Sequence, residues 1–179
     1  PEPVRICVKI TIKDDDLHVD FAGTQEQVAG PINITRNGML AAVFFLLKAL
    51  IDPESPSNAG IYRAFTVSAE PGMILNAKNP AAVGERIDTA MRIADVVFGA
   101  LAPAAGLRSM AGSNGSCTTA LFSGSDPEDP DRYHVYMETI GGGAGAHRDM
   151  DGQNGVQVHM TNTSNLPVEA LEMEFPLII

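Results

Sequence analysis

Apolar and polar residues alternate at the start of the chain. In residues 4–12, VRICVKITI, every second residue is apolar, which is the pattern of a half-buried strand. The acidic turn KDDD leads back into a second alternating stretch, LHVDF at residues 17–21, so the pattern predicts an opening hairpin. Short apolar stretches predict further strands at YRAFTVSA, SCTTALFSG, YHVYMET, VQVHM and VEALEMEF, which are residues 62–69, 116–124, 133–139, 156–160 and 168–175.

Two longer segments carry apolar residues at helical spacing. A first helix is predicted from Asn37 to Ile51, and Asp52 with the proline after it ends the run. A second helix is predicted from about Pro80 to Ala102, with Pro103 expected to stop it. Because strands outnumber helices and do not alternate with them regularly, the predicted class is α+β, with a mixed, largely antiparallel sheet packed with two main helices. The length of 179 residues fits a single domain over residues 1–179.

Charge and composition exclude some classes of function. The formal net charge is -10 and the lysines and arginines are scattered singly, which argues against a nucleic-acid partner. No apolar run reaches the length of a membrane span. Cys7 and Cys117 lie far apart without a C-x-x-C motif, so a reducing, cytoplasmic compartment is expected.

The stretch ETIGGGAGAHRDMDGQNGVQVHMTNT, residues 138–163, concentrates the candidate chemistry. Its glycines satisfy G-x-G-x-x-A, but a dinucleotide site needs a helix directly after them. The segment HRDMDGQNG that follows contains two more glycines and predicts no helix, so this reading is rejected. Two interpretations stay open: backbone N–H groups that approach an anion or oxyanion, or a wide turn between strands.

Several polar side chains near the glycines are candidates as well. His147, Asp149 and Asp151 form H-x-D-x-D, which fits either metal ligands or a solvated loop. His159 is expected on the polar face of the strand at residues 156–160, directed toward the same region as Glu138. Cys117, in the small-residue loop SMAGSNGSCTT, fits either a nucleophile or a buried strand residue.

Five segments, in order, resemble the hydantoinase B family: DFAGTQEQVAGPIN, NAGIYR, ERIDTAMRIADVVFGALA, METIGGGAGA and GVQVHMTNTSNLPVEALE. This family includes the B-type subunits of ATP-dependent hydantoinases, the matching half of 5-oxoprolinase, and the alpha subunits of acetone and acetophenone carboxylases. The resemblance covers nearly the whole chain but only the C-terminal part of a B-type subunit. The histidine- and aspartate-rich motifs that precede this part in the family are absent, so the chain is interpreted as a fragment or a split subunit.

The resemblance implies partners and cofactors that lie outside this segment. A hydantoinase A-type subunit would bind ATP and phosphorylate the substrate oxygen, and the remainder of the B-type subunit would hold a divalent metal, within a hetero-oligomer. No metal ligand is assigned to this segment. The phosphorylated intermediate of a hydantoin, N-methylhydantoin or 5-oxoproline would then be opened by water. The alternatives are carboxylation of a ketone on the same scaffold and, in another class, a non-catalytic assembly module.

The resemblance and the residue types together select the candidate site. Catalytic roles are expected for Glu138, His159 and Asn114. Substrate-binding roles are expected for Gly141, Gly142, Gly143, Gly145 and Asn162. Glycine N–H groups would hold developing negative charge, and a carboxylate beside them would handle a proton.

Overall fold

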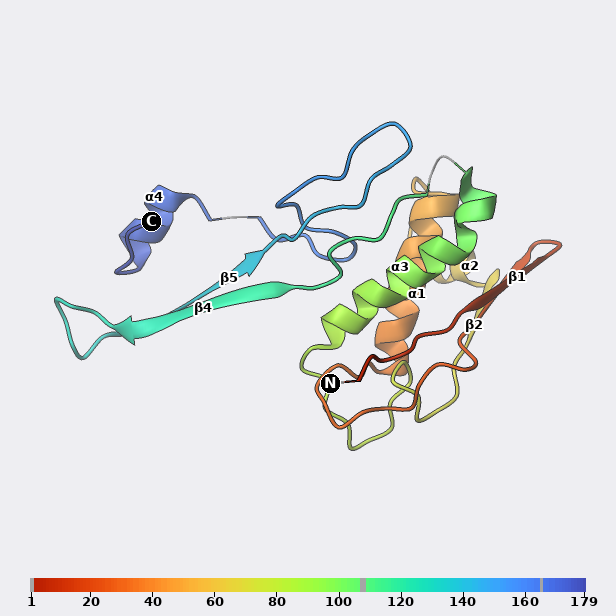
Figure 1. The fold of residues 1–179 in the computed structure, drawn as a ribbon, viewed down its shortest axis with the longest axis horizontal. Helices are drawn as coiled ribbons and strands as arrows, with labels where there is room; N and C mark the ends of the chain where they lie inside the picture. The colour runs from red at the N-terminus through yellow and green to blue at the C-terminus, as the bar shows by residue number, and fades with distance from the viewer. Residues whose placement is uncertain (1, 107–108, 165) are drawn as a thin grey trace.

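The structure, a computed structural model, describes residues 2–106, 109–164 and 166–179. Its elements in chain order are β1 (Lys9–Lys13), β2 (Asp16–Asp20), α1 (Arg36–Ile51), α2 (Ala59–Tyr62), β3 (Phe65–Ser68), α3 (Arg86–Ala105), β4 (Thr118–Ser125), β5 (Tyr133–Ile140) and α4 (Val168–Glu174). Figure 1 shows an N-terminal lobe that runs from β1 to α3. A long arm formed by β4 and β5 leads away from this lobe to α4 and the C-terminus. None of the helices in the described ranges is both long and apolar enough to cross a membrane.

The lobe contains a mixed three-stranded sheet in the order β1-β2-β3. β1 pairs antiparallel with β2, which confirms the predicted opening hairpin, although the strand begins at Lys9 and not at residue 4. β2 pairs parallel with β3, with Leu17 opposite Phe65. The residues before β1 form no strand, yet Val4, Ile6 and Val8 still pack against the core, which accounts for their alternation.

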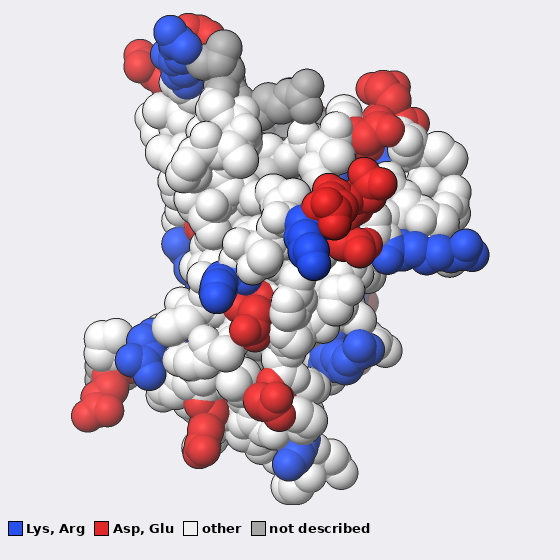
Figure 2. Space-filling view, turned by 90° about the vertical axis from the view of Figure 1, so that its right-hand side faces the viewer, with Lys and Arg blue, Asp and Glu red and all other residues white. Residues whose placement is uncertain are grey.

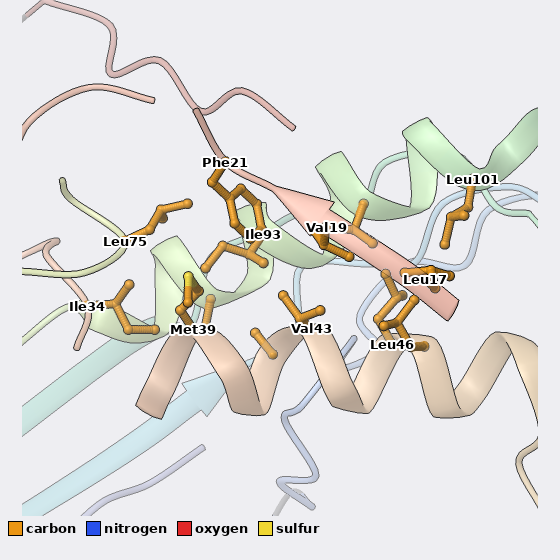
Figure 3. Packing of buried hydrophobic residues seen from close by; sticks show 14 of the residues in the cluster. Leu17, Val19, Phe21, Ile34, Met39, Val43, Leu46, Leu75, Ile93 and Leu101 are labelled. Atoms are coloured by element: carbon orange, nitrogen blue, oxygen red, sulfur yellow. The ribbon is translucent and has the colours of Figure 1, made fainter. Parts of the chain in front are cut away.

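The two main helices and β2 enclose the core of the lobe. α1 begins at Arg36, within one residue of the prediction, and the Thr35 hydroxyl accepts a hydrogen bond from the Gly38 N–H. Val43 and Leu46 of α1 point toward Val19 of β2 and Ile93 of α3, and all four side chains are fully buried (Figure 3). The α+β class, with a mixed sheet and two main helices, is therefore confirmed, although the strands are divided between two sheets.

The predicted boundaries of the second helix are wrong at both ends. α3 starts at Arg86, because residues 80–83 are irregular and residues 84–85 form a turn, and it continues through Pro103 to Ala105. Pro103 lies in the last turn of the helix and has no N–H to donate to the carbonyl four residues earlier. Gly106, at φ 57°, ends the helix and donates its N–H to the Ala102 carbonyl.

The second sheet is the antiparallel pair of β4 and β5, and both strands were predicted. Leu121 lies opposite Met137, and Phe122 lies opposite Tyr136. Asp126 is in the acidic turn between the strands and accepts a hydrogen bond from the Glu128 N–H (2.9 Å). β4 and β5 therefore pair along their whole length, and a polar turn joins them at the tip.

Two other predicted strands are wrong. Residues 156–160 form no strand, because the chain turns at His159, which has a φ of 50°. Residues 168–174 form helix α4, in which Leu171 is buried and Met173 is 86% exposed. The apolar residues of VEALEMEF also fit the four-residue spacing of a helix, since Leu171 and Phe175 share one face.

Lysine and arginine residues do not form a continuous patch on the face that Figure 2 shows. Lysine and arginine side chains are dispersed over this face, and acidic side chains lie among them. An extended basic surface of the kind that follows a phosphate backbone is thus not seen on this face.

Candidate functional site

A stripe of charged side chains on α3 holds the loop that leads into β4. Asp88, Arg92 and Asp95 are spaced by four and three residues, so they share one helix face. The N–H of Cys117 donates to Asp88 Oδ1 (3.1 Å). Arg92 donates to the carbonyls of residues 113, 114 and 115, the two outer bonds being 3.4 Å long. The half of this loop that leads into β4, residues 113–117, is therefore fixed to the helix.

The side chain of His159, which lies much later in the sequence, contacts the same charged stripe of α3. Its Nε2 lies 2.8 Å from Asp95 Oδ1, and its side chain is only 3% exposed. Its ring centroid lies 5.9 Å from that of Phe98 on α3. The side chain therefore points at α3, and the expected position on the polar face of a strand is wrong. A positive φ is uncommon for a residue other than glycine, and here the surrounding contacts hold it.

Asp95 is the centre of this arrangement. Its Oδ1 accepts hydrogen bonds from His159 and from the N–H of Ser113 (3.3 Å), while its Oδ2 lies 3.0 Å from Arg92 Nη1 without hydrogen-bond geometry. Burial raises the pKa of Asp95, but the hydrogen bonds from His159 and Ser113 and the charges of His159 and Arg92 outweigh it, so the pKa lies below its usual value. A buried carboxylate with these partners fixes α3, the loop before β4 and the turn at His159 to one another.

The glycine-rich segment packs against two other loops. The N–H of Gly143 donates to Val156 O (3.2 Å), and that of Ala144 donates to Gln153 O (2.8 Å). Gly143 has a φ of 123°, a conformation that favours glycine, and a Cβ at Gly145 would overlap the Ala111 carbonyl. These glycines allow three chain segments to approach closely. Whether others of the segment bind an anion or oxyanion stays a prediction.

Asn114 lies beside this glycine-rich segment, as expected for two parts of one site. Its backbone N–H donates to Gly143 O (3.2 Å) and its side-chain Nδ2 donates to Ser116 O (2.9 Å). A Cβ at Gly142 would overlap the Asn114 side chain, so the two residues face each other. Both are exposed, whereas Gly143 and Gly145 are buried, so Asn114 and Gly142 form the accessible side of the junction.

Glu138 lies on β5, away from this junction. The Tyr136 hydroxyl, two residues earlier on the same strand face, donates to Glu138 Oε2. This hydrogen bond raises the pKa of Tyr136, with burial and the charge of Glu138 adding to it. Glu138 lines a groove of about 650 Å³ together with Gly141 and apolar side chains that include Leu171 and Ile179. A carboxylate in a largely apolar groove is suited to activating a water molecule.

The structure thus brings some of the predicted site residues together and leaves others apart. Asn114 and the glycines meet directly, and His159 reaches the same loop through Asp95. Within the described residues, no hydrogen bond links Glu138 to His159 or Asn114. Asn162 is exposed in the segment that follows the turn at His159.

The H-x-D-x-D motif does not form a metal centre in this structure. His147, Asp149 and Asp151 all lie on an exposed loop, and the backbones of His147 and Met150 pair with each other. In the ranges that the structure describes, no three His, Cys, Asp or Glu side chains gather as a metal site would require. The donor set that a divalent metal needs is not assembled by these residues.

Sequence reasoning did not select Asp95 or Arg92 as part of the site. The signal that could have found them is the polar spacing i, i+4, i+7 along α3, which places three charges on one face. The same spacing is equally typical of the solvent-facing side of an amphipathic helix. Cys117 is a half-buried free thiol, and its backbone N–H is anchored by Asp88.

Two solved enzyme structures contain the same fold. A nucleotide-free acetone carboxylase superposes with a TM-score of 0.76 at 16% identity, over 94% of this chain and 23% of its own. The ATP-dependent caprolactamase of Pseudomonas jessenii superposes with a TM-score of 0.69 at 24% identity, over 96% of this chain and 30% of its own. At these identities the likeness shows the fold alone. The lobe and arm therefore have the fold of one part of a much longer enzyme chain.

The sequence identifies the family. Residues 2–179 match the family described as Hydantoinase B/oxoprolinase, and the chain belongs to it, which confirms the resemblance. It is 34% identical over 177 residues to 5-oxoprolinase 1 of Arabidopsis thaliana, covering 97% of this chain and 13% of that protein. It is 31% identical over 181 residues to a protein of Pseudomonas sp. strain NS671 named as the B-type subunit of a D-/L-hydantoinase, covering 97% of this chain and 30% of that protein. The chain thus spans less than a third of these relatives.

Proposed function

We propose that this chain is part of the B-type subunit of an ATP-dependent hydrolase of cyclic amides. The observation that carries the proposal is the family match over residues 2–179, with relatives named as a 5-oxoprolinase and a hydantoinase component. A structural neighbour is named as a caprolactamase, which also acts on a cyclic amide. All three names point to the same substrate class, a lactam or hydantoin ring.

The chemistry of an amide explains why such a reaction uses ATP. An amide carbon is a poor electrophile, and transfer of a phosphoryl group to its oxygen makes it open to attack by water. We propose that a hydantoinase A-type partner binds ATP and performs this transfer. Water then adds to the activated carbon, the ring C–N bond breaks with a proton going to nitrogen, and a second water releases phosphate and leaves a carboxylate.

In this scheme Glu138 is the carboxylate that accepts a proton from the attacking water. The Tyr136 hydroxyl holds Glu138, and the apolar lining of the groove limits competition from bulk water. Asn114, Asn162 and the N–H groups of Gly141, Gly142 and Gly145 would supply donors to developing negative charge, whereas the N–H of Gly143 already donates to Val156 O. His159, buried against Asp95, would act by positioning the loop that carries Asn114.

A divalent metal, where the enzyme uses one, is proposed to lie in the rest of the B-type subunit. The described residues do not assemble a suitable donor set, so no step is assigned to a metal in this segment. What remains for this segment is to bind and orient the activated ring and to accept a proton from water.

The test is product analysis in a complex reconstituted with an A-type partner. Hydantoin, N-methylhydantoin and 5-oxoproline are supplied in turn with ATP, and both ADP and the ring-opened product are measured. The proposal expects ring opening with at least one of them, and only when ATP and the A-type partner are both present. Ring opening that proceeds without ATP would overturn it.

A second candidate is the carboxylation of a ketone, because an acetone carboxylase shares the fold. The same complex is then given acetone or acetophenone with bicarbonate and ATP. A new carbon–carbon bond in the product, with no ring opening of any cyclic amide, would favour this candidate.

A further inference from the structure

The arm formed by β4 and β5 has two faces with different surroundings. Side chains alternate along each strand, so Phe122 and Tyr136 lie on one face. That face is covered in part by the C-terminal segment, since the rings of Tyr136 and Phe175 are 4.9 Å apart. The opposite face carries Leu121, Ser123, Val135 and Met137 at its centre, and no other element in the described part of the chain covers it (Figure 1).

Four of the eight side chains on this uncovered face are large and mainly apolar, and all four are well exposed. Leu121, Tyr133, Val135 and Met137 are 65%, 64%, 57% and 64% exposed. Leu121 and Met137 face each other across the two strands, so these side chains form a continuous surface. The remaining positions on this face, residues 119, 123, 125 and 139, are threonine or serine, and none is charged. We call this set of eight residues the outer arm face.

The arm also has free edges. Among the residues that the structure describes, β4 and β5 pair only with each other, so each strand has one edge without a neighbouring strand. On β5 the Thr139 carbonyl accepts a hydrogen bond from the Gln157 side chain (3.1 Å). An isolated two-stranded hairpin is marginally stable in water, and an exposed edge beside an apolar face invites further pairing. A hairpin with apolar residues on both faces is suited to a position between two layers of protein.

We propose that the outer arm face is covered by polypeptide from the remaining part of a B-type subunit. The related D-/L-hydantoinase and caprolactamase chains are covered to only 30% by this chain, so most of each lies outside the shared segment. The superposition on caprolactamase nevertheless extends over 96% of this chain, so it takes in the arm. The outer arm face has no charged residue. This fits permanent packing against another part of the same subunit, because transient partners are usually attracted by complementary charges.

This inference rests on the family and not on the ring-opening reaction, so it is tested without ATP or substrate. The 179-residue chain is mixed with the separately produced polypeptide that supplies the rest of a B-type subunit, and the dissociation constant is measured. The variant is Leu121→Glu with Met137→Glu, which places two charges at the centre of the outer arm face. The matched control is Ile12→Glu, because Ile12 on β1 is also exposed (59%).

The proposal expects tight association for the unmodified chain and for Ile12→Glu, and at least about 100-fold weaker association for the double variant. Circular dichroism should show the same folded content in all three, because the altered side chains are already exposed. Unchanged affinity of the double variant would overturn the proposal. So would a homodimer of the unmodified chain that the double variant dissociates and the added polypeptide does not, since a second copy would then be the occupant.

Discussion

Removal of the Asp95 carboxylate tests the junction between α3, the loop before β4 and the turn at His159. In Asp95→Ala the buried His159 Nε2 and the Ser113 N–H both lose their acceptor. A buried donor left without a partner costs about 1–3 kcal/mol, and a lost hydrogen bond to a backbone N–H costs about 0.5–1.5 kcal/mol. Arg92 keeps its three carbonyl partners and is 43% exposed, so loss of its ion pair adds at most about 1 kcal/mol. The expected loss of unfolding free energy is about 2–4 kcal/mol.

Urea unfolding of the purified chain measures this loss. With a denaturant slope of about 2 kcal/mol per molar, the midpoint should fall by about 1–2 M. The matched control is Asp88→Ala on the same helix face, which removes one hydrogen bond to the Cys117 N–H and should cost about 1 kcal/mol. If Asp95→Ala were no more destabilising than Asp88→Ala, the role given to Asp95 would be refuted.

Two further predictions concern the same junction. Gly145→Ala should destabilise the protein by about 1–3 kcal/mol because its Cβ would overlap the Ala111 carbonyl, whereas Gly112→Ala, with open space around it, should stay within about 0.5 kcal/mol of the unmodified protein in the same urea assay. The pKa of Asp95 is lowered on folding, so its stabilising effect is complete above the unfolded value of 3.8 and is lost as pH falls through the lower folded value. The stability difference between the unmodified protein and Asp95→Ala should therefore shrink below about pH 4, and a difference that grows on acidification would contradict this sign.

Patterns of apolar residues predicted most of the fold. The first helix followed from its apolar spacing and the stop beside it, and the strands β4 and β5 followed from short apolar stretches on either side of a polar turn. The segment VEALEMEF was misread because Leu171, Met173 and Phe175 alternate while two of them also fit a helix face. Over eight residues the two-residue period of a strand cannot be separated from the period of a helix. The segment forms a helix because the helix buries Leu171.

The candidate site was predictable only in part. Asn114 and the glycine-rich segment were selected from the resemblance and the residue types, and they do meet. The contact between His159 and Asp95 joins residues 64 positions apart, and no local pattern encodes such a pairing. His159 lies in a turn at residues 159–160 and not in a strand, because its tertiary contacts with α3 override the apparent alternation of residues 156–160.

The central claim is that this segment contributes to ring opening after the substrate has been phosphorylated elsewhere. A single-turnover measurement in the reconstituted complex tests it most directly, with ADP and ring-opened product followed separately in Glu138→Gln. The control is Glu128→Gln, an exposed carboxylate in the turn of the arm. The account predicts a normal burst of ADP and at least about 100-fold slower ring opening in Glu138→Gln, with the control unchanged. Ring opening at the unmodified rate in Glu138→Gln would contradict it.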